Sequence, residues 1–343
     1  MTTLSQNAVV PCQLVGPMKI IGPELNGELQ VPFATFEAPL WPSVNRGAKI
    51  SRLTAGIKVT ILRDCMTRSI LLSAESSENL ANILASLQNV RAELNQAVAA
   101  TGRFVNLLNI HSEVVGNLLF LRLEFSTGDA AGHNMTTKAS EAVLGYLLKK
   151  YPELKYISVS GNFCTDKKVS AVNSILGRGK YVVAEILIPK EICEKHLKTK
   201  PEKVVELNIK KNLLGSIISG GVCSANAHFA NMLLGVFLAT GQDVANIVEG
   251  SQGLVHVEMQ GADLYFSVTL PNIIVGTAGK SKKMDFSQEN LRILGCLEQR
   301  IIGANSRRLA GIVGATVLCG ELSLLAALTN YGELMRTHEL FER

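Results

Sequence analysis

The chain has 343 residues, of which 47% are hydrophobic, 18% charged and 5% aromatic. This length allows one or two domains with a large buried core. The 29 glycines are scattered through ordered-looking segments, which excludes collagen and long disorder. The formal net charge of +5 is too small to indicate a nucleic-acid-binding protein, so we expect no nucleic-acid partner.

The seven cysteines indicate a reducing compartment. Their number is odd and none forms a C-x-x-C pair, which argues against a zinc site and against a disulfide framework. Residues 1–14 lack the charged and apolar regions of a signal peptide. We therefore expect a cytoplasmic protein without a metal ion.

One apolar stretch raises the question of a membrane span. Residues 309–328 are about long enough to cross a bilayer, for which about 20 residues are needed. Glu321 lies within this stretch, and small residues dominate it. We expect a buried core helix and no membrane association.

The first 68 residues predict short strands and loops, because six prolines interrupt them and long helices cannot run through proline. The middle of the chain has clear periodicity, and Ser76 is a plausible N-cap. In order, it predicts a strand (69–74), a helix (76–100), two strands joined at Gly116 (104–115 and 117–125), a helix (130–150) and a strand (156–159). This β-α-β-β-α-β order is typical of a ferredoxin-like antiparallel sheet with two helices on one face.

The remainder mixes strands (181–188 and 264–270) with helices (224–239 and 306–332) that are rich in Ala and Gly. Small residues let helices approach closely, so one of them is expected to be buried at the centre of a large domain. The sequence thus predicts an α+β fold. A large mixed α/β domain (1–69 and 159–343) with a buried central helix receives an inserted ferredoxin-like small domain (70–158).

A polar cluster follows the last strand of the small domain. Residues 160–168 include Ser160 and place Asp166 beside Lys167 and Lys168. The cluster either binds an anionic substrate, with a lysine that stabilises a developing oxyanion, or is an ordinary solvated loop.

Three further stretches carry candidate polar groups. Residues 128–134 open a helix with small residues, which suits phosphate binding as well as a plain helix start. His228 and Asn231 are three residues apart and share one helix face, with Asp243 just past the helix. His228 by itself is more often structural.

Two acid–base candidates lie near the ends of the chain. Glu37 stands among apolar residues, where burial would raise its pKa and make it a proton donor; the alternative is an edge-strand glutamate facing water. His338 lies in the C-terminal segment and is of interest if that segment closes over a site.

Seven segments, in this order, resemble the catalytic portion of 3-hydroxy-3-methylglutaryl-CoA (HMG-CoA) reductases. They are residues 66–68, 128–134, 160–168, 211–216, 227–231, 241–243 and 320–324. The compact form is similar to the eukaryote-type, class I reductases. The resemblance implies reduction of HMG-CoA to mevalonate and CoA, with two NADPH, in the mevalonate pathway of isoprenoid biosynthesis.

The resemblance also implies residue roles. Lys167 would stabilise the oxyanion, Glu37 would donate a proton, Asp243 would link the two, and His338 would protonate the departing CoA thiolate. The implied substrate-binding residues are Arg68, Ser160, Asp166, Lys168, Lys211, His228 and Asn231. The implied NADPH-binding residues are Thr101, Arg103, Phe104, Asp129, Ala131, Gly132, His133, Asn134, Gly276, Thr277 and Gly279.

The family site is built between subunits, so the resemblance implies a homodimer or homotetramer, with the large domain binding substrate and the small domain binding NADP(H). Two departures from the family pattern stand out. His133 replaces an apolar residue more usual there, and the glycine turn at 276–279 continues with Lys280, Lys282 and Lys283. The alternatives are a catalytically silent relative that binds CoA thioesters, a reductase of another acyl-CoA and a scaffold protein.

Overall fold

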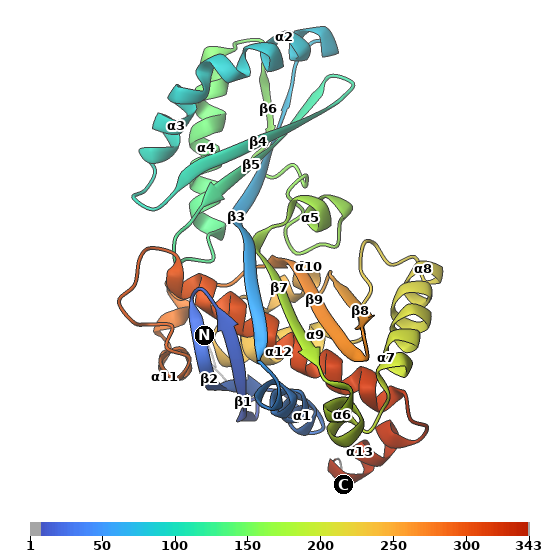
Figure 1. Cartoon of the computed structure of the whole chain (residues 1–343). Helices are drawn as coiled ribbons and strands as arrows, with labels where there is room; N and C mark the ends of the chain where they lie inside the picture. The colour runs from blue at the N-terminus through green and yellow to red at the C-terminus, as the bar shows by residue number, and fades with distance from the viewer. Residues whose placement is uncertain (1–7, 342–343) are drawn as a thin grey trace, which may run out of the picture.

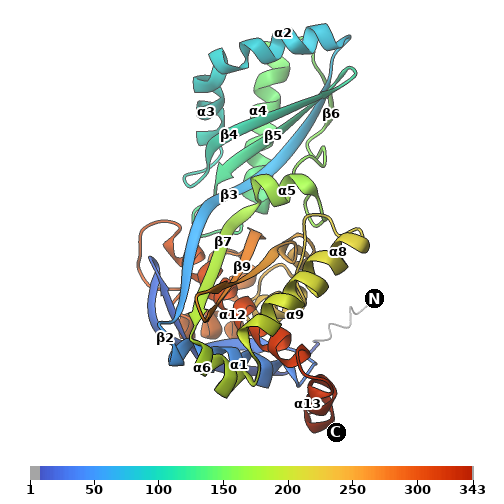
Figure 2. The same ribbon diagram turned by 45° about the vertical axis from the view of Figure 1, so that its right-hand side comes forward.

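The computed structural model describes residues 8–341, except for the side chains at 337, 338 and 341. It has a large lobe and a smaller lobe, joined mainly by one long strand (Figures 1 and 2). The sheet of the large lobe has the strand order β2 (Leu25–Ala34), β1 (Cys12–Gly22), β3 (Ile57–Ser73), β7 (Gly179–Ile188), β9 (Asp263–Ile273) and β8 (Leu254–Gln260).

Strand β3 belongs to both lobes. Residues 58–65 pair with β7 in the large lobe, and residues 66–73 pair with β5 (Leu118–Ser126) in the small lobe. The strand predicted at 69–74 is therefore the last part of a 17-residue strand. Where β3 passes from one lobe to the other, Asp64 is paired in register with Lys180 of β7, and Asp64 Oδ1 lies 3.4 Å from Lys180 Nζ.

The small lobe has the predicted ferredoxin-like order. Its antiparallel sheet runs β4 (Asn106–Val115), β5, β3 and β6 (Lys155–Ser158). Helices α2 (Ser77–Leu87), α3 (Arg91–Ala99) and α4 (His133–Lys150) cover one face (Figure 1). The Ser76 Oγ accepts the Asn79 N–H at 3.2 Å and caps α2. The helix predicted at 76–100 is divided by a 3₁₀ turn at Gln88–Val90.

The expectation that the first 68 residues hold no long helix is wrong. Helix α1 (Leu40–Leu53) has 14 residues and contains Pro42. Proline is tolerated there because it lies in the first turn, where the backbone N–H has no intrahelical partner.

Helix α12 (Ala304–Leu328) is the buried central helix, and residues 309–323 are all buried. It is long and apolar enough to span a membrane, but 89% of its apolar window is buried inside the protein. Close packing explains its small residues: a Cβ on Gly320 would lie 2.1 Å from the Met232 sulfur of α9 (Phe229–Ala239). A Cβ on Gly47 of α1 would likewise lie 2.3 Å from the Cys319 carbonyl oxygen.

The two lobes have separate hydrophobic cores that share no buried residue. The other helices are short or peripheral: α5 (Ala171–Leu176), α6 (Lys190–Ile192), α7 (Pro201–Leu207), α8 (Gly215–Ile218), α10 (Ile247–Gly250), α11 (Asp285–Ile293) and α13 (Glu333–Phe341). Helix α9 begins at Phe229 rather than at 224, because Ala225 forms a parallel bridge with Leu254 of β8. The Asn226 side chain accepts the Phe229 N–H at 3.2 Å just before the helix.

Candidate active site

Lys167 and Asp243 form an ion pair in the large lobe. The Lys167 Nζ lies 2.7 Å from the Asp243 Oδ2, and each side chain is about two-fifths exposed, at 40% and 39%. The hydrogen bond and charge of Asp243 raise the pKa of Lys167. Burial works to raise the pKa of Asp243, but the hydrogen bond and charge of Lys167 outweigh it and the pKa is lowered. Both groups are therefore charged at neutral pH.

A buried ionic network holds the loop that carries Lys167. The Arg178 guanidinium lies 3.0 Å from Asp166 Oδ1 and 2.8 Å from Glu249 Oε1. The same Glu249 oxygen accepts the backbone N–H of Lys167 at 3.1 Å. Arg178 is 1% exposed and Glu249 is fully buried. This backbone contact supports the positive φ of 56° at Lys167. Sequence reasoning missed both Arg178 and Glu249.

The loop that carries Asp243 is fixed at the C-terminus of α9. Three consecutive backbone carbonyl groups at the end of α9 accept hydrogen bonds from side chains of the segment 282–290. Asn290 donates to Ala239 O at 2.7 Å, Ser287 donates to Thr240 O at 2.9 Å, and Lys282 donates to Gly241 O. Burial lowers the pKa of Lys282 to about 8. One lysine of the run that follows the glycine turn, Lys282, is thus buried and holds the Asp243 loop by a hydrogen bond.

The two predicted cofactor segments lie side by side. Residues Ala130 and Ala278 form a parallel bridge, and the Asp129 carbonyl accepts the Thr277 N–H at 2.8 Å. Gly276 is required here because a Cβ would lie 2.3 Å from the Ala131 nitrogen. The Asp129 carboxylate is already used: it accepts the N–H groups of Gly303 (3.1 Å) and Ser306 (3.0 Å) at the start of α12.

The third predicted cofactor segment, at residues 101–104, lies in the small lobe, with Thr101 half-buried and the other three residues exposed. The Arg103 guanidinium lies 5.2 Å from the centre of the Phe104 ring. Lys138 of α4, which sequence reasoning missed, donates to Thr101 O at 2.8 Å and adds a second cation. Asn134 is exposed near the start of α4.

Two predicted substrate residues, Arg68 of β3 and Ser160 of the polar loop, are in contact. The Arg68 guanidinium donates to Thr137 Oγ1 at 2.6 Å and to Ser160 Oγ at 3.4 Å. Lys168 Nζ donates to Asp166 O at 3.1 Å and is exposed. Arg68 of β3 and Lys168 of the 160–168 loop therefore lie where an anionic ligand can reach them.

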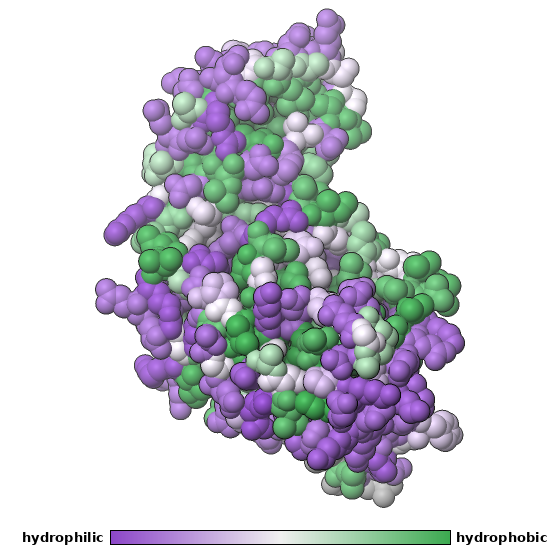
Figure 3. Space-filling view, viewed as in Figure 1, coloured by the Kyte–Doolittle hydropathy of each residue, from purple (hydrophilic) through white to green (hydrophobic). Residues whose placement is uncertain are grey.

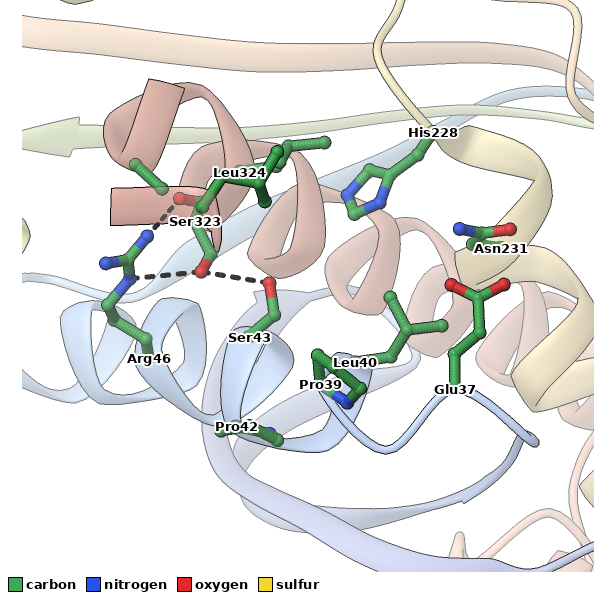
Figure 4. A pocket seen from close by; sticks show the side chains of 12 residues that line it. Glu37, Pro39, Leu40, Pro42, Ser43, Arg46, His228, Asn231, Ser323 and Leu324 are labelled. Carbon is green, nitrogen blue, oxygen red and sulfur yellow. Dashed lines mark hydrogen bonds between the residues drawn. The ribbon is translucent and has the colours of Figure 1, made fainter. Parts of the chain in front are cut away.

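A second group of predicted residues surrounds a cavity of about 380 Å³ (Figure 4). Glu37, His228 and Asn231 line it together with the apolar Leu40 and Leu324. The expectation that Glu37 is buried is wrong: β2 ends at Ala34, and Phe36 and Glu37 are exposed. Its apolar neighbours misled the prediction because Phe36 itself is exposed and the loop after β2 carries Glu37 to the cavity rim.

Glu321 anchors this cavity from α12. It is fully buried and accepts the backbone N–H groups of Ala227 (2.9 Å) and His228 (2.6 Å). Burial raises the pKa of Glu321. Lys211, in the helical segment Asn208–Leu214, is half-buried, and burial lowers its pKa while the charge of Glu321 opposes this.

The predicted residues therefore form two groups at opposite ends of α9. His228 precedes the helix and Asp243 follows it, and an 11-residue helix is about 17 Å long. Within one chain the structure brings Lys167 to Asp243, whereas Glu37 lies at the other end with His228. His338 falls within α13, but its side chain lies outside the described part of the structure.

The structure thus has a ferredoxin-like unit inserted in a larger α/β lobe, and the larger lobe carries a lysine–aspartate pair. A family model described as hydroxymethylglutaryl-coenzyme A reductase matches residues 6–343. The chain belongs to this family of oxidoreductases, as the resemblance predicted.

Named relatives and solved structures agree. The HMG-CoA reductase of Aeropyrum pernix is 44% identical over 97% of this chain and 79% of its own length. A rice (Oryza sativa subsp. japonica) enzyme is 42% identical over 97% of this chain and 63% of its own length. A class II reductase structure from Streptococcus pneumoniae, described as bound to NADPH, has a TM-score of 0.77 at 18% identity, over 96% of this chain and 88% of that one. It supports the fold alone.

No group of three or more histidine, cysteine or acidic side chains that could hold a metal ion occurs in the described part of the chain. The seven cysteines are all free.

Proposed function

We propose that this chain reduces HMG-CoA to mevalonate and CoA, with two NADPH, in the mevalonate pathway. The observation that carries the proposal is the Lys167–Asp243 pair, 2.7 Å apart, with Ser160 on the same loop as Lys167 and Arg68 of β3 donating to Ser160. Asp243 keeps the Lys167 ammonium charged, and this charge stabilises the oxygen that becomes negative when hydride adds to a carbonyl carbon.

Arg68, Ser160 and Lys168 bind the carboxylate of the HMG group, since a guanidinium and an ammonium favour a carboxylate. Asp166 remains paired with Arg178 and so holds the 160–168 loop in position. A neutral acyl group would not need this set of cations, which argues against another acyl-CoA as the substrate.

The residues present fit NADPH, which supplies the hydride when bound. Arg103 and Lys138 lie around residues 101–104 and suit a 2′-phosphate, and the Phe104 ring offers a stacking face. At the junction of the lobes, residues 129–131 lie against Gly276, Thr277 and Ala278. Gly132, His133 and Asn134 continue the first of these segments, and Gly279 continues the second. Asp129 acts here by capping α12 and so holding the two segments together.

The active site is built between two subunits, as a homodimer or a dimer of dimers. The group at one end of α9 has the oxyanion lysine but no proton donor, and the group at the other end has Glu37, His228, Asn231 and Lys211. A two-fold pairing can place one chain's Lys167 beside its partner's Glu37. The exposed apolar residues Ile217 (71%) and Ile218 (87%) on α8 support such an interface, where Figure 3 shows a hydrophobic patch.

Glu37 then donates the proton to the reduced oxygen, and His338 protonates the CoA thiolate as it leaves. Helix α13 packs beside the Glu37 cavity through Leu334 and carries His338 four residues further along. Closure of this helix over bound CoA would bring the histidine to the sulfur. The free cysteines support a reducing, cytoplasmic location.

The test is the oxidation of NADPH by the purified chain with HMG-CoA, followed by its absorbance. We expect two NADPH to be consumed for each CoA released. A protein that binds HMG-CoA but consumes neither NADPH nor NADH would instead be the catalytically silent relative.

A further inference from the structure

A buried nitrogen without a hydrogen-bond partner lies near the Lys167–Asp243 pair. It is the Nε2 of His133, the first residue of α4, whose side chain is 22% exposed. Its nearest ionic neighbour is Asp166 Oδ1, at 3.9 Å, which is too long for a hydrogen bond. An unpaired buried polar group costs roughly 1–3 kcal/mol, so a bound ligand atom is the natural partner.

Four charged groups from the surrounding loops act on this ring: Arg178, Asp166, Asp243 and Lys167. They are already matched, since Lys167 pairs with Asp243 and Arg178 pairs with Asp166. Burial first, and then the charge of Arg178, lowers the pKa of His133. The imidazole is therefore neutral at pH 7, and a neutral imidazole can donate one N–H without losing a proton.

The backbone that carries this ring is held in place. Gly132 has a φ of 98°, and a Cβ there would lie 2.5 Å from the Thr127 methyl carbon, so that only glycine fits. The His133 carbonyl accepts the Thr137 hydroxyl at 2.9 Å, and the same hydroxyl accepts Arg68 at 2.6 Å. His133 is thus tied to the substrate loop as well as to the cofactor segment.

We propose that His133 is a further catalytic residue, whose Nε2–H donates a hydrogen bond to the same carbonyl oxygen that Lys167 stabilises. The proposal rests on the proposed function. When hydride reaches the carbonyl carbon, a C–H bond forms, the π electrons of the C=O bond move to oxygen and the nicotinamide is oxidised. His133 keeps its proton, and two donors then share the negative charge.

The test compares His133→Met, which removes the donor, with His133→Gln, which keeps an N–H. His256→Met is the matched control, because that histidine is 62% exposed and its ring contacts Glu258 on its own strand and Tyr265 on the next. An apolar residue is more usual in the family at position 133, so we expect the methionine variant to fold, which circular dichroism checks.

We expect His133→Met to lower kcat about tenfold or more, at the low end for an oxyanion donor because Lys167 remains. The loss should appear with both HMG-CoA and free mevaldehyde, since both hydride transfers place charge on this oxygen. His133→Gln should recover most of it. The affinities for HMG-CoA by calorimetry and for NADPH by fluorescence should stay within about threefold, because a transition-state donor adds little to ground-state binding.

Two outcomes overturn the assignment while the proposed function stands. One is a wild-type kcat in His133→Met; the other is weaker NADPH binding with an unchanged kcat, which would make His133 a cofactor contact only. Absence of turnover in the wild-type protein would instead remove the proposed function, and the assignment of His133 with it.

Discussion

The two ends of helix α9 differ in the groups that balance their charged side chains. At the C-terminal end, Lys167, Asp243, Arg178 and Glu249 form a matched network in which every carboxylate faces a cation. At the N-terminal end, the fully buried Glu321 is satisfied mainly by backbone N–H groups, and an apolar cavity lies beside it. The first end is suited to stabilising charge that appears during a reaction, and the second to holding a group in place.

The largest effect is expected from removing the reacting charge. Lys167→Ala should abolish turnover, a loss of at least a hundredfold in kcat, because no other ammonium is paired with Asp243 in the described chain. The matched control is Lys210→Ala, whose lysine is 69% exposed and pairs with Glu206. Thermal unfolding should show both variants folded. Substantial residual turnover in Lys167→Ala would contradict the oxyanion role.

The separation of the two ends predicts complementation between subunits. Lys167→Ala and Glu37→Gln should each be inactive alone, but chains mixed by co-expression should recover about one quarter of wild-type activity, because half of the dimers are mixed and each has one intact site. Differently tagged chains allow mixed dimers to be purified and assayed. If mixed dimers are as inactive as the single variants, the site is not shared as proposed.

A substitution at the N-terminal end of α9 should lower the stability of the fold more directly than it lowers the reaction rate. Glu321→Ala leaves two partly buried N–H groups without an acceptor, and we expect the free energy of unfolding to fall by about 2–4 kcal/mol in urea denaturation. Glu321→Gln keeps one acceptor oxygen and should cost less. Glu113→Ala, on an exposed strand position, is the control and should change stability by under about 0.5 kcal/mol. Equal stabilities for Glu321→Ala and the control would show that Glu321 anchors nothing.

Features that local sequence determines could be predicted, whereas features that depend on tertiary contacts could not. The small lobe follows local periodicity, so its element order and the Ser76 cap were predictable. Helix α1 was missed because Pro39 and Pro42 look like breakers, although both lie at its start. The partners Arg178 and Glu249 are 71 residues apart and meet only through tertiary packing, so no local pattern marks them. The division of the site between the two ends of α9 likewise requires the fold.

The smallest expected effect is a pH dependence of stability that belongs to His133. Its pKa is lowered in the folded chain, by burial and then by Arg178, below the value of about 6.5 for a free histidine. Between these two values the unfolded chain binds a proton that the folded chain does not. The free energy of unfolding therefore falls as the pH drops below about 6.5.

His133→Met removes this contribution and leaves the other titrating groups in place. Between pH 7.5 and pH 5.5, the wild-type protein should lose more stability than the variant, by an amount on the order of 1 kcal/mol, in paired urea titrations. An equal loss in both proteins would mean that the ring is solvated and freely protonated. It would then be a poor candidate for the neutral donor beside Lys167, even if the network of Arg178 and Glu249 remained intact.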